Sequence, residues 1–530
     1  MTIDRILVRG RSKVAWLDTA VPEEAKAVFE KREHAVEQCT AAQLAEPAYL
    51  AGIGAVVLTG NPTDSVPLRR QLTDHARTLL AYDCRVIVIT ALDDATRKSL
   101  IATVGRLQLP NARLVSTDDK ETFKGFQDPE GDPPLPHVRF YAPSTPWETI
   151  ANFVAYHPAG KTPDPTVVIV PEDSFEEFDR LLLRRAFAGC AEVHLAPMEG
   201  GRSGANVYRA QARIDGFSGG WTQPYFVKTG KRKAIVKEFV NYEEKVDPYV
   251  PFHLGPNLLR DRCCLDAMRG VIVGDYVEES ESLKQCASGG RAAQAIACLF
   301  DRTLRGWYRN SEPDNRLLMD IVYLPKDYPE AVIKTAREIG AKFDSKAFTE
   351  HFARCTDKPW LSGPVHGDLH ATNVRVRATE AIVIDFGAHR DDLVLRDIAR
   401  LEVSLLVDGF EGAPYENMMD RAKYKGKDWL ESVEKLYHVN PTANDPRPHE
   451  DPKSPSYWFH TCVRQIRLHA RQFERGRAQY AAALALELLI KSSRDDEVLP
   501  FESYRRAAAF YLAEQLLLSV FPAVAVAKTA

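Results

Sequence analysis

The segment VHGDLHATNVRVRATEAIVIDFG carries the residues of this chain whose types and spacing most clearly indicate chemistry. Its Asp368 stands five residues before Asn373, and Asp385 follows twelve residues after that asparagine. An aspartate can orient a hydroxyl group and accept its proton, while an amide and a second carboxylate can bind the Mg²⁺ ions that bridge nucleotide phosphates. We therefore predict phosphoryl transfer, with Asp368, Asn373 and Asp385 as catalytic residues and the last two as metal ligands.

The elements around these residues support the prediction. Val374–Val376 and Ala381–Ile384 are short apolar runs that predict two strands joined by a turn. Asn373 and Asp385 would then lie at neighbouring strand ends. The alternative is that HGD and DFG are unrelated loop tripeptides, but both occur in order, at this spacing, between apolar strands.

Upstream, a glycine-rich stretch could bind phosphate. The sequence MEGGRSGANVYR puts Gly200, Gly201, Ser203 and Gly204 between two candidate strands. Backbone amides in such a loop can approach an anion without obstruction by side chains. We predict ATP binding here, although a simple hairpin turn would have a similar sequence.

A lysine in the next apolar strand, PYFVKTG, is a second candidate for phosphate binding. Lys228 would be unfavourable in a buried strand unless it met an anion, so we predict contact with the α- and β-phosphates of ATP. The following helical pattern offers Glu238, Glu243 and Glu244 as its ion-pair partner, and the pattern alone leaves the choice among them open. Further on, VIVGDYV predicts another strand.

The motif HGDLH, in place of the HRDL of protein kinases, is similar to the aminoglycoside, choline and fructosamine kinases. Together with GGRSGA, IDFG and RDIARLE, it resembles the kinase-like ternary-complex-associated domains of bacterial conflict systems, roughly over Val167–Phe521. At the hinge that this resemblance implies, we expect backbone groups of Asp275, Tyr276 and Val277 to contact adenine.

The resemblance implies a bilobal α+β protein-kinase-like fold with a helical C-lobe. It implies ATP and Mg²⁺ as cofactors, transfer to a hydroxyl of a small molecule or a protein, and a role in antiviral defence. It also makes Glu238 the partner of Lys228, and gives His366 and Asp397 structural roles in the catalytic loop. His370 either reaches substrate or is simply a hydrogen-bonded imidazole.

The first 160 residues alternate apolar strands with helices, which predicts an α/β domain with a parallel sheet covered on both faces. The strands are expected at Arg5–Val8, Ala55–Leu58, Arg85–Ile89 and around 137–141, and the helices at about 22–37, 66–81, 94–107 and 146–156. The segment VIVITALDD resembles a response-regulator receiver. However, Thr59 and Gly60 stand where a receiver carries its phospho-acceptor aspartate, and no acidic pair follows the first predicted strand. We therefore predict a receiver-like domain that docks a second copy of the chain or a partner protein.

Composition excludes several classes of function. A net charge of −4 and a pI of about 6.4 argue against nucleic acid as the main partner. Nine cysteines without a CxxC pair favour reduced thiols and a cytoplasmic protein, and the first ten residues lack the apolar core of a secretory signal. The apolar stretch Ala507–Ala527 is interrupted by Glu514 and Pro522, so a buried helix is expected rather than a membrane span.

The length predicts more than one domain. Residues 1–160 would form the receiver-like domain, 167–279 the kinase-like N-lobe and 280–530 the C-lobe, with a linker at Pro158–Pro165. Two alternatives to a kinase remain open: a nucleotide-binding pseudokinase that regulates or scaffolds a partner, and an enzyme of the same fold that transfers AMP. The chemically competent residues at Lys228, Asp368, Asn373 and Asp385 favour an enzyme.

Overall fold

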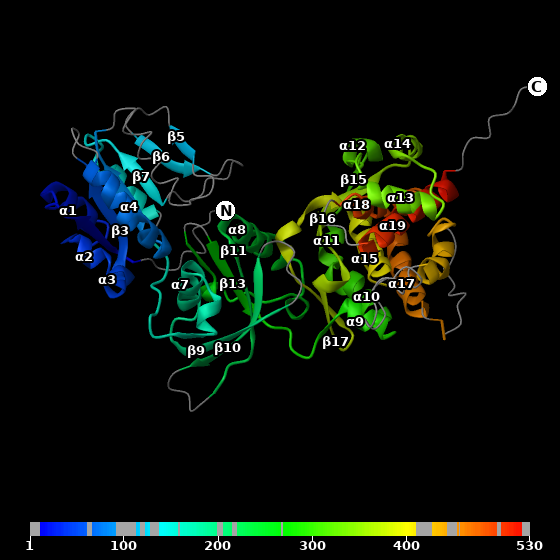
Figure 1. The fold of residues 1–530 in the computed structure, drawn as a ribbon, viewed down its shortest axis with the longest axis horizontal. Coiled ribbons are helices and arrows are strands. Elements are labelled where there is room, and N and C mark those ends of the chain that lie inside the picture. Colours follow the sequence, from blue (N-terminus) through cyan, green and yellow to red (C-terminus); the bar gives the residue numbers. More distant parts are fainter. Residues whose placement is uncertain are drawn as a thin grey trace, which may run out of the picture. The chain divides into compact units, whose positions relative to one another are not determined.

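The structure is a computed structural model that describes residues 11–60, 66–91, 113–116, 122–127, 137–156, 159–198, 205–214, 220–266, 269–409, 427–442, 453–454, 456–494 and 500–521 (Figure 1). The chain forms two compact units. The first consists of Met1–Val240 and Asn257–Tyr276, and the second of Asn241–Pro256 and Val277–Ala530. Within the described ranges, no helix combines the length and the apolar character needed to cross a lipid bilayer.

The first unit begins with a seven-stranded sheet in the order β2-β1-β3-β4-β7-β6-β5. Its first five strands are parallel, and β6 and β5 extend the sheet in antiparallel pairing. The strands are β1 (Lys13–Leu17), β2 (Val36–Cys39), β3 (Ile53–Thr59), β4 (Arg85–Ile89), β5 (Arg113–Ser116), β6 (Thr122–Gln127) and β7 (Val138–Tyr141). The helices are α1 (Glu23–Glu30), α2 (Ala41–Leu44), α3 (Pro47–Gly52), α4 (Val66–Ala81) and α6 (Trp147–Tyr156).

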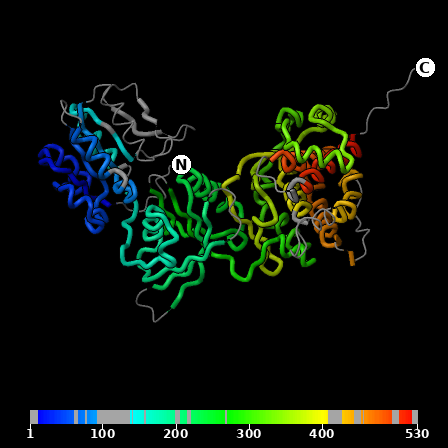
Figure 2. Tube along the Cα trace, viewed as in Figure 1, coloured from blue at the N-terminus to red at the C-terminus, as the bar shows by residue number. Residues whose placement is uncertain are grey.

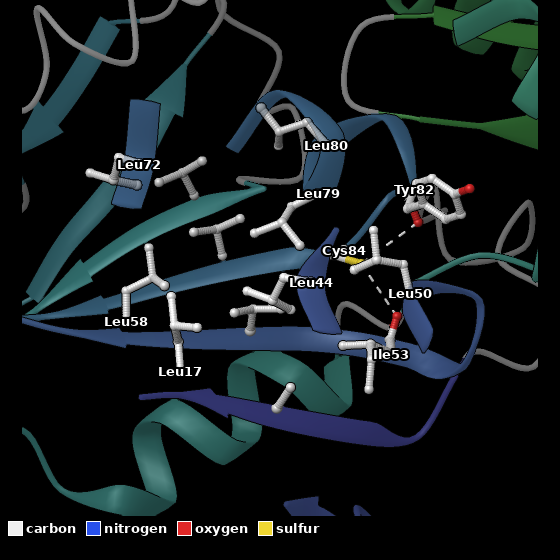
Figure 3. Packing of buried hydrophobic residues seen from close by; sticks show 14 of the residues in the cluster. Leu17, Leu44, Leu50, Ile53, Leu58, Leu72, Leu79, Leu80, Tyr82 and Cys84 are labelled. Atoms are coloured by element: carbon white, nitrogen blue, oxygen red, sulfur yellow. Dashed lines mark hydrogen bonds between the residues drawn. The ribbon is translucent and has the colours of Figure 1, made fainter. Parts of the chain in front are cut away.

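Alternate residues of each strand point to opposite sides of this sheet, so the strands supply apolar side chains to both of its faces. Both faces are buried. Leu17 and Leu58 pack on one face with leucines of α2, α3 and α4 (Figure 3). Trp16 and Val57 pack on the other face with apolar side chains of α1 and α6. The predicted parallel α/β domain is thus present.

Several boundaries differ from the prediction. The segment KVAWL forms β1, and Asp18 follows it with a left-handed φ of 56°. The predicted helix over 22–37 is wrong in its second half, because α1 ends at Glu30 and residues 36–39 form β2, which pairs with β1. The strand expected at Arg5–Val8 and the helix expected at 94–107 lie outside the described residues.

The first unit also contains a six-stranded sheet in the order β12-β13-β11-β10-β9-β8. Its strands are β8 (Val168–Val170), β9 (Cys190–Pro197), β10 (Asn206–Ile214), β11 (Tyr225–Lys231), β12 (Cys264–Leu265) and β13 (Arg269–Asp275). Helix α7 (Glu177–Ala186) packs on one face through Leu182 and Leu183. Helix α8 (Arg232–Asn241) packs on the other through Ile235 and Phe239.

The two sheets of the first unit share part of one core. Phe178 and Leu181 of α7 belong to the same apolar cluster as the leucines that cover β1, β3 and β4. The segment predicted as a linker is tied in as well, since the Gly160 amide donates to Asp83 Oδ2 at 2.7 Å. The Asp83 carboxylate is buried and also accepts from Arg85 at 3.0 Å and from His137 at 2.7 Å. The predicted linker is therefore a packed part of the unit.

This buried network predicts a pH dependence of stability. Burial is the main reason that the pKa of His137 falls to about 4, with the Arg85 charge acting in the same direction. Between about pH 6.5 and pH 4 the unfolded chain therefore binds a proton that the folded chain does not. The free energy of unfolding should decrease as the pH falls through this window, and His137→Gln should flatten that decrease.

Chemical denaturation of the full chain at pH 7.0, 6.0 and 5.0 would measure the effect. His194→Gln is a matched control, because the His194 side chain is 48% exposed in the same unit. Equal pH slopes for wild type and His137→Gln would contradict the prediction.

The second unit is mainly helical. Its principal helices are α9 (Leu283–Ser288), α10 (Ala292–Cys298), α13 (Glu330–Glu338), α14 (Ser345–Phe352), α15 (Val394–Gly409), α17 (Tyr457–Phe473), α18 (Gln479–Ser492) and α19 (Pro500–Val520). The last three, orange to red in Figure 2, form the centre of the unit with α15, and α18 is almost completely buried. Two small sheets complete it, made of β14 (Glu281–Ser282), β17 (Val374–Arg377) and β18 (Glu380–Val383), and of β15 (Glu312–Asp314), β16 (Trp360–Val365) and β19 (Arg390–Leu393). The described residues thus combine mixed α/β parts with a helical C-terminal region.

Candidate active site

The predicted catalytic segment lies in the second unit, between β16 and β19. Strands β17 and β18 form a tight antiparallel hairpin in which Val374 lies opposite Val383. The Ile384 amide donates to the Asn373 carbonyl at 2.9 Å, which continues the pairing by one step. Asn373 and Asp385 therefore lie at adjacent strand ends, as the two apolar runs predicted.

His366 joins the two halves of this segment. Its imidazole is fully buried, with Nε2 3.0 Å from the Ile384 carbonyl, while Nδ1 accepts from the Asp368 amide at 3.2 Å. A carbonyl on one side and an amide on the other require the neutral tautomer with hydrogen on Nε2. Burial lowers the pKa of His366, which is consistent with this neutral form. His366 thus holds the backbone of the loop and does not point to solvent.

Asp397, at the start of α15, fixes the turn before Asp368. Its carboxylate accepts the His366 amide at 2.8 Å and the Gly367 amide at 3.0 Å, and Tyr308 Oη lies 3.2 Å from it. Gly367 has a left-handed φ of 80°, and a Cβ there would lie 2.1 Å from the Ala388 carbonyl oxygen. Only glycine fits at this position.

Three residues that were not predicted as site residues also hold the loop. Arg400 donates to the Gly367 carbonyl at 2.7 Å, Tyr308 donates to Asp397, and Ser404 Oγ accepts the Ala371 amide at 2.8 Å. Arg400 is anchored in turn by Glu487 of α18, at 3.0 Å. The motif RDIARLE contains Arg400, so its helical spacing with Asp397 could have indicated this role. Nothing in the local sequence indicates Tyr308.

Asp368 itself is partly exposed, with 47% of its side chain accessible, so a substrate hydroxyl could reach it. Burial of the other half would raise the pKa of its carboxyl group. The hydrogen bond and charge of His370, with smaller effects of His366 and Arg494, outweigh burial and lower the pKa to about 2. Asp368 is thus an anion at neutral pH and can accept a hydrogen bond from an incoming hydroxyl.

Asn373 and Asp385 offer side-chain oxygen atoms that could bind Mg²⁺. The Asn373 side-chain nitrogen donates to the Asp368 carbonyl at 3.0 Å, which orients the amide and leaves Oδ1 as the atom that could meet a cation. Asp385 has a left-handed φ of 66°, an unfavourable conformation for a residue with a Cβ.

These oxygen donors fit Mg²⁺, which usually takes only one or two carboxylates from a protein and completes its shell with phosphates and water. Among the described residues, His, Cys, Asp and Glu side chains form no group of three or more that could hold a metal ion.

The predicted lysine site lies in the first unit. Lys228 on β11 and Glu238 on α8 form an ion pair, with 2.7 Å between Nζ and Oε2. Both side chains are nearly buried, at 7% and 9% exposure. Of the three candidate glutamates, Glu238 is therefore the one at Lys228. Glu243 and Glu244 lie beyond the end of α8, in a π-helical turn.

The remaining predicted ATP contacts are only partly described. Gly200, Gly201, Ser203 and Gly204 lie outside the described residues.

At the predicted hinge, the Asp275 amide donates to the Asn257 carbonyl at 2.9 Å and the Tyr276 amide to the Pro224 carbonyl at 3.2 Å. These two amides are already used within the protein. The contact of these three residues with adenine stays a prediction.

Solved structures of several small-molecule kinases are similar to this chain at low sequence identity. A glucosamine kinase in complex with glucosamine, ADP and inorganic phosphate is 11% identical, with a TM-score of 0.35 over 78% of this chain and 95% of that chain. The choline kinase LicA from Streptococcus pneumoniae is 13% identical, with a TM-score of 0.28 over 58% and 89%. An aminoglycoside phosphotransferase from Streptomyces rimosus is 17% identical, with a TM-score of 0.25 over 53% and 96%.

No curated protein matches the sequence. Residues 342–488, which span the catalytic segment and α15, match the family described as ternary complex associated domain 9. This match confirms the resemblance that the sequence motifs indicated for this part of the chain. Residues 342–488 are thus similar to ternary complex associated domain 9.

Proposed function

We propose that this protein transfers the γ-phosphoryl group of ATP to a hydroxyl group, with Mg²⁺ as the metal. The observation that carries the proposal is the arrangement in the second unit. Asp397 fixes the turn before Asp368 through two backbone amides, and one hairpin brings Asn373 and Asp385 to adjacent strand ends. A half-exposed carboxylate beside two oxygen ligands is what phosphoryl transfer requires, because this reaction depends on positioning and charge stabilisation.

The proposal includes a kinase-like fold for Val167–Phe521, with the six-stranded sheet as the N-lobe and the helical unit as the C-lobe. Domain boundaries at 1–160, 167–279 and 280–530 belong to it. The Lys228–Glu238 ion pair supports this assignment, because a buried lysine on a strand paired with a glutamate on the next helix is a recurrent phosphate-binding arrangement in this fold.

In the proposed reaction, the hydroxyl oxygen attacks the γ-phosphorus while the bond from that phosphorus to the β-phosphate oxygen breaks. Asp368 orients the hydroxyl and accepts its proton, and ADP leaves. Lys228 contacts the α- and β-phosphates, and the Val277 amide contacts adenine. Bound Mg²⁺ would neutralise charge on the phosphates, and Asn373 and Asp385 would hold it.

For residues 1–160 we propose a receiver-like domain that serves docking. The order of its five parallel strands, β2-β1-β3-β4-β7, is that of flavodoxin-like sheets. Strand β3 ends on Thr59, whose hydroxyl lies 3.2 Å from that of Thr19, so a hydroxyl pair lies where a receiver has its phospho-acceptor. Docking of a second copy or of a partner protein, and a role in bacterial defence, are parts of this proposal.

Isotope transfer tests the function directly. The purified chain would be incubated with Mg²⁺, cell extract and ATP labelled at either the γ- or the α-phosphate, with Asp368→Asn as the inactive control. Transfer of the γ-label that depends on Asp368 is the expected result. Transfer of the α-label would instead establish AMP transfer, and nucleotide binding without transfer of either label would establish a pseudokinase.

A further inference from the structure

Two side chains of the catalytic loop, His370 and Thr372, have no role in the proposed reaction. The His370 imidazole lies between two neighbours: Nδ1 is 2.7 Å from Thr372 Oγ1, and Nε2 is 3.5 Å from Asp368 Oδ2. The backbone of this turn is itself held, because the His370 amide donates to the Asp368 carbonyl at 3.0 Å and the Asn373 amide donates to the His370 carbonyl at 2.9 Å. These two hydrogen bonds fix the backbone of the turn that carries the three side chains.

From this geometry we infer that Thr372 and His370 form a positioning relay for Asp368. A hydrogen on Nε2 faces Oδ2 and holds the carboxylate so that Oδ1 is presented to the substrate hydroxyl. The inference rests on the proposed function, since it assigns a task to groups around the proposed base. It differs from a substrate-contact role for His370, which would leave Asp368 unaffected.

The groups on either side of the His370 ring, the Thr372 hydroxyl and the Asp368 carboxylate, determine which ring nitrogen carries hydrogen. If Nδ1 carried the only hydrogen, the lone pair of Nε2 would face a carboxylate oxygen, which is repulsive. If the Thr372 hydroxyl donates to Nδ1, the hydrogen lies on Nε2 and points to Oδ2. In the imidazolium form Nε2 also carries a hydrogen. Both acceptable forms therefore direct an N–H group toward Asp368.

The distance of 3.5 Å between Nε2 and Oδ2 is an ion-pair distance, longer than the usual range of about 2.7–3.2 Å for an N–H···O hydrogen bond. Catalytic hydrogen bonds are often long without substrate and shorten in the reactive complex. His370 has 36% of its side chain exposed and Thr372 is exposed, so the ring can move the few tenths of an ångström that this requires. Asp368 would then be fixed on one side while its other oxygen stays open.

Because the acceptor is unidentified, water is the practical probe. The slow hydrolysis of Mg²⁺–ATP to ADP and phosphate uses the same proposed base, and it yields kcat and the KM for ATP. His370→Ala should lower kcat about tenfold or more with little change in KM, because a misplaced reacting group slows the chemical step. His370→Gln should recover much of the loss, because its side-chain amide can put an N–H group near the position of Nε2.

The second pair of variants tests the other end of the relay. Thr372→Val should lower kcat several-fold, and Thr372→Ser should restore it, because only the hydroxyl is needed. Wild-type kcat in both His370→Ala and Thr372→Val would overturn the relay, and so would an effect on KM alone.

A readout without turnover separates this inference from the proposed function. In the full chain labelled with ¹⁵N in its histidine rings, the His370 signal is identified by its loss in His370→Gln. We expect hydrogen on Nε2 and a change in the ring signals in Thr372→Val. A ring with hydrogen only on Nδ1 would overturn the relay, even in an active enzyme. Hydrogen on Nε2 in a protein without any ATP turnover would instead refute the proposed function alone.

Discussion

Replacing Asp368 with asparagine is expected to reduce phosphoryl transfer by roughly 10²- to 10⁴-fold, the usual contribution of a positioned base. Asparagine has the same shape but cannot accept the proton of the substrate hydroxyl. The half-exposed side chain is not part of the buried core, and the loop is held by Asp397 and His366 through its backbone, so the fold should persist.

The same variant should leave the affinity for ATP within a few-fold of wild type, because Mg²⁺, Lys228 and Val277 hold the nucleotide in the proposal. Asp391→Asn is a matched control, since Asp391 is an exposed aspartate on β19 of the same unit. Turnover and calorimetric ATP affinity would be measured for all three proteins. Unchanged turnover in Asp368→Asn would remove Asp368 from the reaction.

The second large effect concerns the metal. ATP should bind much more tightly with Mg²⁺ than with a chelator, and Asp385→Ala should abolish this difference. Asp385 holds a left-handed conformation at the end of β18, which is tolerated where surrounding structure requires it and is frequent at functional sites. A carboxylate that only stabilised the turn would be indifferent to metal.

Asn373→Ala should reduce the gain from Mg²⁺ less than Asp385→Ala does, because a neutral amide contributes less to a divalent cation than a carboxylate. Calorimetric titration of ATP into wild type and both variants, each with Mg²⁺ or a chelator, would measure this order. Equal wild-type affinity in the two conditions would support the pseudokinase alternative over the kinase.

The site in the second unit could be predicted from the sequence because its residues lie close together along the chain. Asp368, Asn373 and Asp385 lie within eighteen consecutive residues, and two short strands bring Asn373 and Asp385 to adjacent strand ends. The structural role of Asp397 is instead implied by the resemblance that its motif, RDIARLE, carries. Tyr308 could not be predicted, because its hydrogen bond to Asp397 spans 89 residues and depends on how the helices pack.

The N-terminal strands show a different limit. Strand β1 contains Lys13 and Trp16, so its sequence lacks the run of aliphatic residues that marks β3 and β4. Strand β2 is at the edge of the sheet. Its sequence, VEQC, predicts the end of the preceding helix. The two strands are defined by their pairing with each other and by the pairing of β1 with β3, which no local sequence pattern predicts.

Helix α7 has a consequence for how such chains can change during evolution. Its Leu182 and Leu183 belong to the core of the six-stranded sheet, while Phe178 and Leu181 belong to the core of the first sheet. Recombination that exchanged residues 1–160 for an unrelated domain would leave Phe178 and Leu181 on the surface, beside the buried guanidinium of Arg185, which now donates to the Ala81 carbonyl. The two sheets are therefore expected to be inherited together, and an exchange of the N-terminal domain should bring substitutions in α7 with it.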